Sequence, residues 1–135
     1  MLPNSLGRNE RLKSRTIIGN LFRDGKALSA FPIRLVYLIE SSENGAVQAA
    51  FSVSTRNFKK ATDRNRIKRL MREVYRTQKH PLQELVVSNK QQLSIFFIYT
   101  GKELPDFELI KIKTVTVIEL LIKKISSQKI NSADK

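Results

Sequence analysis

The sequence predicts a single α+β domain, and three observations support this fold class. The chain has 135 residues, the ordinary length of one domain, and 41% of them are hydrophobic, which is enough to fill a core. Three segments have the alternating, or β-branched and aromatic, composition of strands: residues 33–40, 46–54 and 93–99. Segments with the apolar spacing of helices precede, separate and follow these strands. We therefore expect a small sheet with helices packed on it.

The first helix is predicted over residues 14–24, with Ser14 as its N-cap and Gly25 at its end. One side of this helix is suited to packing against the sheet, because its apolar residues recur at intervals of one, three and four. These residues are Ile17, Ile18, Leu21 and Phe22.

Residues 33–40 predict a strand that is covered on both faces, because apolar side chains occupy both of its alternating sets. The Asn44-Gly45 dipeptide that follows is typical of a tight hairpin turn. We therefore expect residues 46–54 to return as a second strand beside the first. Four apolar residues share one side of this second strand: Val47, Ala49, Phe51 and Val53.

The next helix is predicted over residues 64–76, after a basic loop at 55–61 and a cap at Thr62 or Asp63. The helix should end before Pro81, because the residue that precedes a proline is biased away from helical conformation. Its core-facing stripe consists of Ile67, Leu70, Met71 and Val74.

The C-terminal part of the chain adds a short helical piece at 82–88, the third strand and a long helix. Residues 107–125 begin with strand-like alternation and continue with helical spacing, and we expect a helix there. The predicted domain spans residues 1–125, and a polar, frayed tail follows at 126–135.

The positive charge of the chain is concentrated in one segment. The formal net charge is +13, from 25 Lys and Arg against 12 Asp and Glu. Residues 55–80 hold ten basic and two acidic residues, so these 26 positions carry +8 and the other 109 carry +5. Such an excess indicates a polyanionic partner, which is RNA, DNA or an anionic membrane surface.

On a helical wheel, five cations and one Asn share a contiguous side of the helix at 64–76, beside its apolar stripe. A helix face that is only solvated usually carries both positive and negative side chains, because like charges at i and i+4 repel. Arg66 falls on the other flank, near Glu73, which we expect to be its partner. The predicted RNA-binding residues of the face are Arg64, Lys68, Arg72, Asn65, Arg76 and Arg69, and those of the preceding loop are Arg56, Lys59 and Lys60.

Few residues are suited to catalysis or metal binding. The absence of Cys excludes thiolate nucleophiles and thiolate metal sites, and His80 is the single histidine. The densest acidic group, at 103–108, is interpreted as a solvated loop rather than a metal site. No apolar run of about 18 residues and no secretory signal occur. We therefore expect a cytoplasmic protein without catalytic or metal-binding side chains.

From the residues alone, the chain is predicted to be a basic module that binds RNA or DNA. Tyr37 is the best candidate to stack on a base, because its strand precedes the segment that delivers the basic loop. The alternatives are a non-catalytic or ribosome-associated RNA-binding protein, a domain on an anionic membrane, and a DNA-reading helix. The apolar stripe is committed to a core, which disfavours the membrane, and no helix with a short turn precedes the basic one, which disfavours DNA reading.

Residues 51–76 read FSVSTRNFKKATDRNRIKRLMREVYR and resemble the motif of the bacterial ribonuclease P protein family. That motif is a strand, a basic loop and a helix that opens with R-N-R-x-K-R-x-x-R-E. Weaker agreement extends the resemblance to most of residues 11–76. The matching positions of the motif are Arg64, Asn65, Arg66, Lys68, Arg69, Arg72 and Glu73.

The resemblance implies a compact two-layer α/β sandwich with a small, mostly antiparallel sheet, similar to the ribosomal protein S5 domain 2-like fold. It also implies a left-handed βαβ crossover, which is uncommon. The implied partners are a catalytic RNA subunit and precursor transfer RNA, with no membrane and no small-molecule substrate. In that enzyme the RNA removes the 5′ leader of the precursor with Mg²⁺ that the RNA holds, and the protein binds both RNAs and promotes metal binding.

The resemblance further implies two sets of contacts. The motif residues Arg64, Asn65, Arg66, Lys68, Arg69 and Arg72 would contact the catalytic RNA or lie beside it. A cleft for the single-stranded leader would involve Ile18, Phe22, Tyr37 (or Val36), Ser52 and Ser54. Two positions depart from the family: Thr55-Arg56 stands where Lys-Lys is frequent, and Ile18 stands where Phe is frequent, which would weaken leader stacking there.

Overall fold

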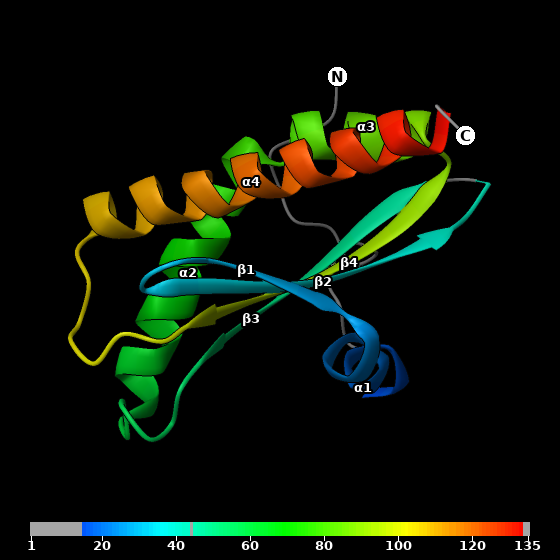
Figure 1. The fold of residues 1–135 in the computed structure, drawn as a ribbon. Coiled ribbons are helices and arrows are strands. Elements are labelled where there is room, and N and C mark those ends of the chain that lie inside the picture. The colour runs from blue at the N-terminus through cyan, green and yellow to red at the C-terminus, as the bar shows by residue number, and fades with distance from the viewer. Residues whose placement is uncertain (1–14, 44, 134–135) are drawn as a thin grey trace.

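The computed structural model describes residues 15–43 and 45–133, and the side chains of residues 18–43 and 45–127. The described residues form a mixed α+β fold (Figure 1). Its elements are α1 (Arg15–Asp24), β1 (Lys26–Ala30), β2 (Ile33–Ser41), β3 (Ala46–Val53), α2 (Ala61–Gln78), α3 (His80–Ser88), β4 (Gln91–Tyr99) and α4 (Phe107–Ala133).

The four strands form one sheet in the order β1-β2-β4-β3. The pairs β1·β2 and β2·β4 are antiparallel and the pair β3·β4 is parallel, so the expectation of a mostly antiparallel sheet is confirmed. The predicted hairpin of β2 with β3 is wrong, because β4 lies between them. Strand β4 is largely buried, and it occupies one of the two interior positions of the sheet, between β2 and β3.

The turn between β2 and β3 reverses the chain without pairing the two strands. Gly45 has a φ of +62°, which favours glycine, and a Cβ there would stand 2.7 Å from the Cα of Val87. The turn therefore rests against the end of α3, and β3 begins at the far edge of the sheet. Strand β1 is not predicted from the sequence, because it is short and three of its five residues are exposed.

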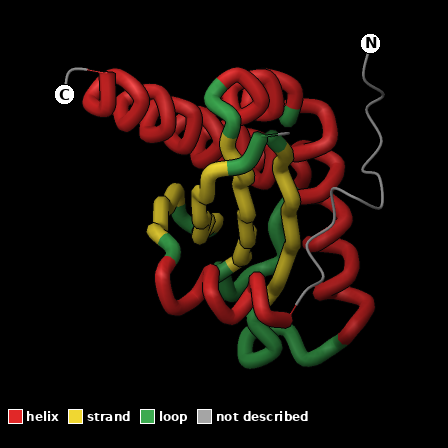
Figure 2. The backbone as a smooth tube through the Cα atoms, turned by 90° about the vertical axis from the view of Figure 1, so that its right-hand side faces the viewer, coloured by secondary structure: helices red, strands yellow, loops and turns green. Residues whose placement is uncertain are grey.

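Helices cover the sheet unequally. Helices α2, α3 and α4 pack on one face, with α2 and α3 against β3 and α4 against β1 and β2, while α1 packs on the opposite face against β2 and β4 (Figures 1 and 2). The chain passes from β3 to its parallel neighbour β4 through α2 and α3. Seen from these helices, with both strands pointing up, β4 lies to the left of β3, so the crossover is left-handed, as the resemblance implies.

The main core lies between the sheet and helices α2, α3 and α4. The predicted stripe of α2 faces this core, with Leu70 only partly buried, and Tyr75 joins the stripe. Phe97 of β4 is fully buried at its centre, where its ring stacks on Phe51 at 5.2 Å and lies 5.5 Å from the ring of Tyr75. The expected α+β sandwich thus has the interior strand β4 at the centre of its main core.

Helix ends agree with the sequence analysis at some positions and differ at others. The Gly25 N–H donates to the Leu21 carbonyl oxygen at 2.8 Å, so α1 ends where predicted, and Ser14 lies outside the described residues. Helix α2 begins at Ala61, so Thr62 and Asp63 lie within its first turn and neither caps it. The predicted cap is therefore wrong.

The last helix is longer than predicted. Helix α4 continues to Ala133, past residue 125, which is the predicted end of the domain. The division into one domain and a tail stays a prediction. In the part of the chain that the structure describes, no helix combines the length and the apolar character that crossing a membrane requires.

Candidate nucleic-acid interface

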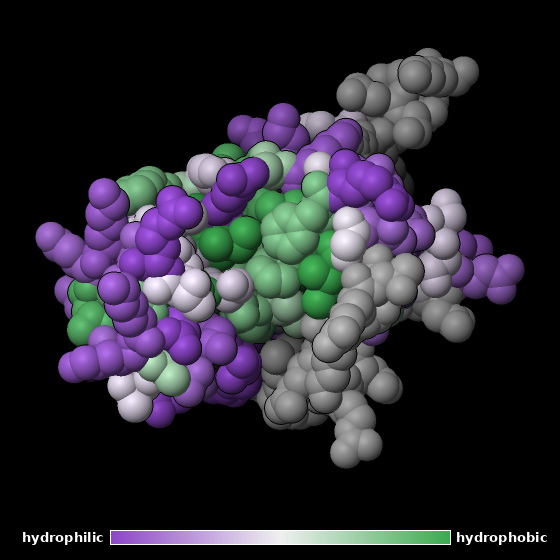
Figure 3. All heavy atoms as spheres, turned by 90° about the horizontal axis from the view of Figure 1, so that it is seen from below, coloured by the Kyte–Doolittle hydropathy of each residue, from purple (hydrophilic) through white to green (hydrophobic). Residues whose placement is uncertain are grey.

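The sheet face that carries α1 is only partly covered and presents an apolar area. Figure 3, which views the molecule from below, shows apolar side chains framed by hydrophilic ones. Phe22 of α1 is 54% exposed, and its ring centroid lies 5.1 Å from that of Phe96 in β4. Ile18 packs partly buried beside them. Two aromatic rings at the border of an open sheet face can stack on unpaired bases.

The predicted cleft residues do not all lie on this face. Ser52 is half-buried on β3 beside Ala50, which packs on the α1 side, and Ser54 follows at the end of the strand. Tyr37, however, is 3% exposed and packs in the core on the opposite face. Its assignment to the cleft is therefore wrong. Val36 points toward α1 instead, because a shift of one residue along a strand reverses the face.

Burial also changes the chemistry of Tyr37. Its surroundings raise the pKa of the phenol above its ordinary value, because the charged form loses hydration there. The phenol is thus neutral across the physiological range and contributes to the core rather than to an RNA contact.

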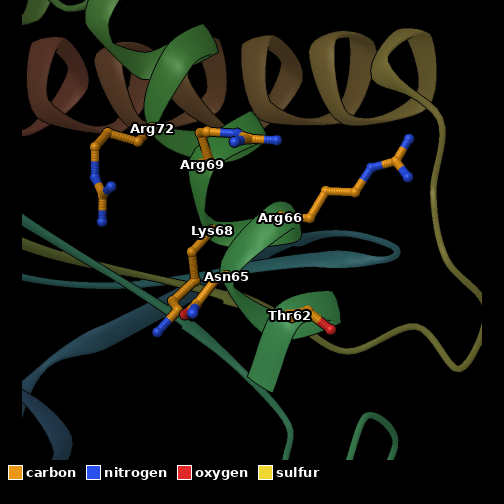
Figure 4. A pocket seen from close by; sticks show the side chains of 6 residues that line it. All are labelled: Thr62, Asn65, Arg66, Lys68, Arg69 and Arg72. Carbon is orange, nitrogen blue, oxygen red and sulfur yellow. The ribbon is translucent and has the colours of Figure 1, made fainter. Parts of the chain in front are cut away.

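Helix α2 carries a hollow of about 440 Å³ that is lined almost entirely by basic and amide side chains (Figure 4). The three arginines and the lysine in it belong to the predicted motif, and Thr62 lines it in addition, although the sequence pattern predicts no RNA contact for Thr62. Thr62 lies one turn before Arg66 on the same helix. Its place in the hollow could be predicted only if the start of the helix at Ala61 were known. The hollow is lined by Thr62, Asn65, Arg66, Lys68, Arg69 and Arg72.

One further cation of α2, Arg76, is already engaged within the protein. Arg76 forms an ion pair with Glu73, so the predicted pair of Glu73 with Arg66 is wrong and Arg66 joins the hollow. The hydrogen bond from Arg76 lowers the pKa of the Glu73 carboxyl. Glu73 is therefore ionised at neutral pH and offsets the charge of Arg76.

The hollow borders the sheet at strand β3. The Arg72 guanidinium carbon lies 5.6 Å from the ring centroid of Phe51, a cation–π contact between α2 and β3. Because β3 is an edge strand, this contact holds the cationic side of α2 beside the edge of the open sheet face. Lys68 and Asn65 point to the same side of α2 in Figure 4.

Comparison with known proteins identifies this arrangement. The family model for Ribonuclease P matches residues 6–111. The chain belongs to the ribonuclease P protein family. It is 37% identical over 107 residues to the ribonuclease P protein component of Porphyromonas gingivalis, with 78% of each chain covered. It is also 37% identical over 119 residues to that of Chlorobium phaeobacteroides, covering 80% of this chain and 82% of the relative.

Solved structures agree with the fold. The RNase P protein of Staphylococcus aureus matches with a TM-score of 0.66 at 17% identity, covering 83% of this chain and 94% of that one. The protein from Thermotoga maritima matches with a TM-score of 0.61 at 24% identity, covering 84% and 96%. A ribonuclease P protein component is part of a metal-dependent ribonucleoprotein that processes transfer RNA.

Among the described residues, no three His, Asp or Glu side chains come close enough together to hold an ion. The acidic residues at 103–108 lie in a loop and the first turn of α4. Within the ranges that the structure describes, the acidic side chains therefore do not gather into a ligand set for a metal ion.

Arg64 has a structural role in addition to its place in the motif. Its Nη1 donates to the carbonyl oxygens of Phe58 at 2.8 Å and Lys59 at 2.7 Å, which fastens the basic loop to the first turns of α2. The remaining loop cations, Arg56, Lys59 and Lys60, are exposed around this turn.

Replacement of Arg64 by Ala is expected to lower the free energy of unfolding by about 1 kcal/mol, because two partly exposed hydrogen bonds are lost. Urea denaturation followed by circular dichroism measures this change. The matched control is Arg69→Ala, whose side chain is exposed in the hollow and should leave stability within about 0.5 kcal/mol of the native value. Equal stability of the two variants would contradict the structural role of Arg64.

Proposed function

We propose that this chain binds the catalytic RNA through the hollow of α2 and its basic loop, and holds the single-stranded 5′ leader of precursor transfer RNA on the open sheet face. The RNA subunit hydrolyses the phosphodiester that joins the leader to the transfer RNA. The observation that carries this proposal is the placement of an almost purely cationic helix side beside an open, partly aromatic sheet face. We place this activity in the cytoplasm, where precursor transfer RNA is made.

The chemistry of the hollow suits a structured RNA. Arginine guanidinium groups contact phosphates with two parallel hydrogen bonds, and three of them line the hollow. Thr62 and Asn65 add neutral hydrogen-bonding groups among the charges. Each phosphate that a cation neutralises releases counterions, so binding should weaken steeply as salt rises, by a log–log slope of about −0.9 per contact for duplex nucleic acid.

The chemistry of the open face suits an unpaired strand. The rings of Phe22 and Phe96 offer stacking surface, and the side chain of Ser52 offers a hydroxyl that can donate or accept. A duplex cannot present its bases to such a surface, whereas a single-stranded leader can.

The metal ion is assigned to the RNA. Ribonuclease P depends on a metal, and we propose Mg²⁺, an ion that prefers oxygen ligands such as phosphates. The side chains of this chain do not assemble a ligand set for it in the described residues. The protein therefore contributes binding and positioning, and the cation side chains lower the repulsion between the two RNAs.

Replacement of Phe22 by Ala should weaken the binding of leader-bearing precursor roughly tenfold, because stacking of one base on an aromatic ring contributes about 1–3 kcal/mol. The affinity of the reconstituted ribonucleoprotein is measured with precursor transfer RNA and with the same RNA trimmed to the mature 5′ end. Only the precursor should lose affinity. Phe107→Ala, at an exposed ring that begins α4 in the other layer, is the matched control and should change neither.

Loss of affinity for both RNAs alike would contradict leader binding by this face. So would a native ribonucleoprotein that binds the precursor and the mature RNA equally well.

A further inference from the structure

We infer that Arg34 of β2 is a further leader-binding residue, which contacts a phosphate of the leader on the open sheet face. This inference rests on the proposed function, and no part of the motif at 51–76 points to it. Arg34 lies in a strand whose sequence predicts coverage on both faces.

The strand geometry directs the Arg34 side chain to the open face. Its neighbours Ile33 and Leu35 are buried in the core under α2, α3 and α4, and side chains alternate along a strand. Arg34 is exposed, whereas Val36, two residues on, is buried under α1. Arg34 therefore lies just beyond the part of the face that α1 covers.

The sheet register places Arg34 in a row of neutral side chains. It is paired with Ser29 of β1 and Ile98 of β4, and Ile98 is paired in turn with Ser52 of β3. Ser52 is thus two strands away, at about 10 Å, and Phe96 occupies the next row, about 7 Å along β4. A strand of RNA that stacks on the Phe22–Phe96 pair is within reach of the Arg34 guanidinium.

Among the residues that the structure describes, no acidic side chain forms an ion pair with Arg34. The strands carry three charged residues, of which Lys26 lies on edge strand β1 and Glu40 lies six residues farther along β2, at about 20 Å. In the described part of the chain no hydrogen bond or ion pair engages the Arg34 side chain, in contrast with Arg64 and Arg76. A free guanidinium on an otherwise neutral face attracts a phosphate and can bind it in a bidentate manner.

The cations of α2 and Arg34 thus stand on different sides of the open face. Helix α2 borders it at β3, and Arg34 lies two strands away on β2. We assign to the hollow of α2 the catalytic RNA, and to Arg34 the leader that crosses the sheet. The two cationic positions then act on different RNAs and can be separated by experiment.

The test compares Arg34→Gln with the native chain in the ribonucleoprotein reconstituted with its RNA subunit. Affinities for leader-bearing and leaderless transfer RNA are measured over a range of salt concentrations. Arg34→Gln should weaken binding of the leader-bearing RNA roughly fivefold and reduce the magnitude of its log–log salt slope by about 0.7, the value for one phosphate of a single strand. Binding of the leaderless RNA should not change.

Two variants complete the design. Arg34→Lys keeps the charge, so it should restore the salt slope while recovering only part of the affinity. Lys111→Gln removes one exposed cation from α4, on the opposite layer, and should behave as the native chain does.

An Arg34→Gln variant that keeps the native leader dependence and salt slope would overturn the inference while leaving the proposed function in place. An equal loss for leaderless RNA would also overturn it, because Arg34 would then contact another part of the complex. If the native chain itself shows no leader dependence, the proposed leader binding fails first, and the role of Arg34 fails with it.

Discussion

Replacement of Lys68, Arg69 and Arg72 together by Gln is expected to weaken binding of the catalytic RNA subunit by roughly 100-fold at moderate salt. All three side chains line the hollow of α2, and a charge-assisted contact with phosphate contributes about 1 kcal/mol or more. The magnitude of the log–log salt slope should fall by about 2 to 3, because three phosphate contacts are lost. Filter binding or fluorescence anisotropy with labelled RNA measures both quantities.

The fold should survive this change. Lys68 is partly exposed and Arg69 and Arg72 are exposed, so the main structural loss is the cation–π contact of Arg72 with Phe51, worth about 0.5–1 kcal/mol. The control is a triple variant on α4, Lys111→Gln with Lys123→Gln and Lys124→Gln, which removes the same charge from exposed positions on another helix. If both triple variants lose affinity equally, only net charge matters and the assignment of the hollow is contradicted.

Replacement of Phe97 by Ala is expected to lower the free energy of unfolding by about 3–5 kcal/mol, a large share of the stability of a domain this size. Phe97 is fully buried on the interior strand β4, and its ring contacts both Phe51 of β3 and Tyr75 of α2. Removing it leaves a cavity where the sheet meets the basic helix. Equilibrium denaturation in urea measures the loss.

Phe22→Ala is the matched comparison, because it removes the same ring from a half-exposed position. It should cost less than about 1 kcal/mol of stability, although it weakens leader binding. The main expected effect of Phe97→Ala is thus on the free energy of unfolding, and that of Phe22→Ala is on leader binding. A loss below about 1.5 kcal/mol for Phe97→Ala would contradict the central place of β4 in the core.

Local sequence patterns predict most of the helices and strands, but they do not predict which strands pair in the sheet. The stripe of α2 follows from the apolar spacing of Ile67, Met71 and Val74, which a helix must bury. The predicted pairing of the strands is wrong, because the Asn44-Gly45 dipeptide encodes a chain reversal and not the identity of the neighbouring strand. That identity depends on contacts distant in sequence, such as the packing of Gly45 against Val87 at the end of α3.

In the candidate site, too, the sequence predicts which residues are present but not which contacts they make. Composition and spacing located the cations of α2, since a one-sided set of charges is visible in the sequence. The engagement of Arg64 with two loop carbonyls, and of Arg76 with Glu73, depends on three-dimensional geometry. The prediction for Tyr37 is wrong because apolar residues occupy both alternating sets of positions in its strand. Such a sequence does not indicate which set faces the main core and which faces the open side of the sheet.

The most direct test of the central claim is a cleavage assay with precursor transfer RNA, the RNA subunit and this chain, alone and combined, across a range of Mg²⁺ concentrations. We predict that the RNA subunit alone removes the leader at high Mg²⁺, that the chain alone cleaves at no concentration, and that the two together cleave the same bond at low Mg²⁺. Cleavage by the chain alone, or a Mg²⁺ requirement that the chain does not lower, would contradict the proposal that the RNA subunit cleaves the bond and the protein binds and positions the RNAs.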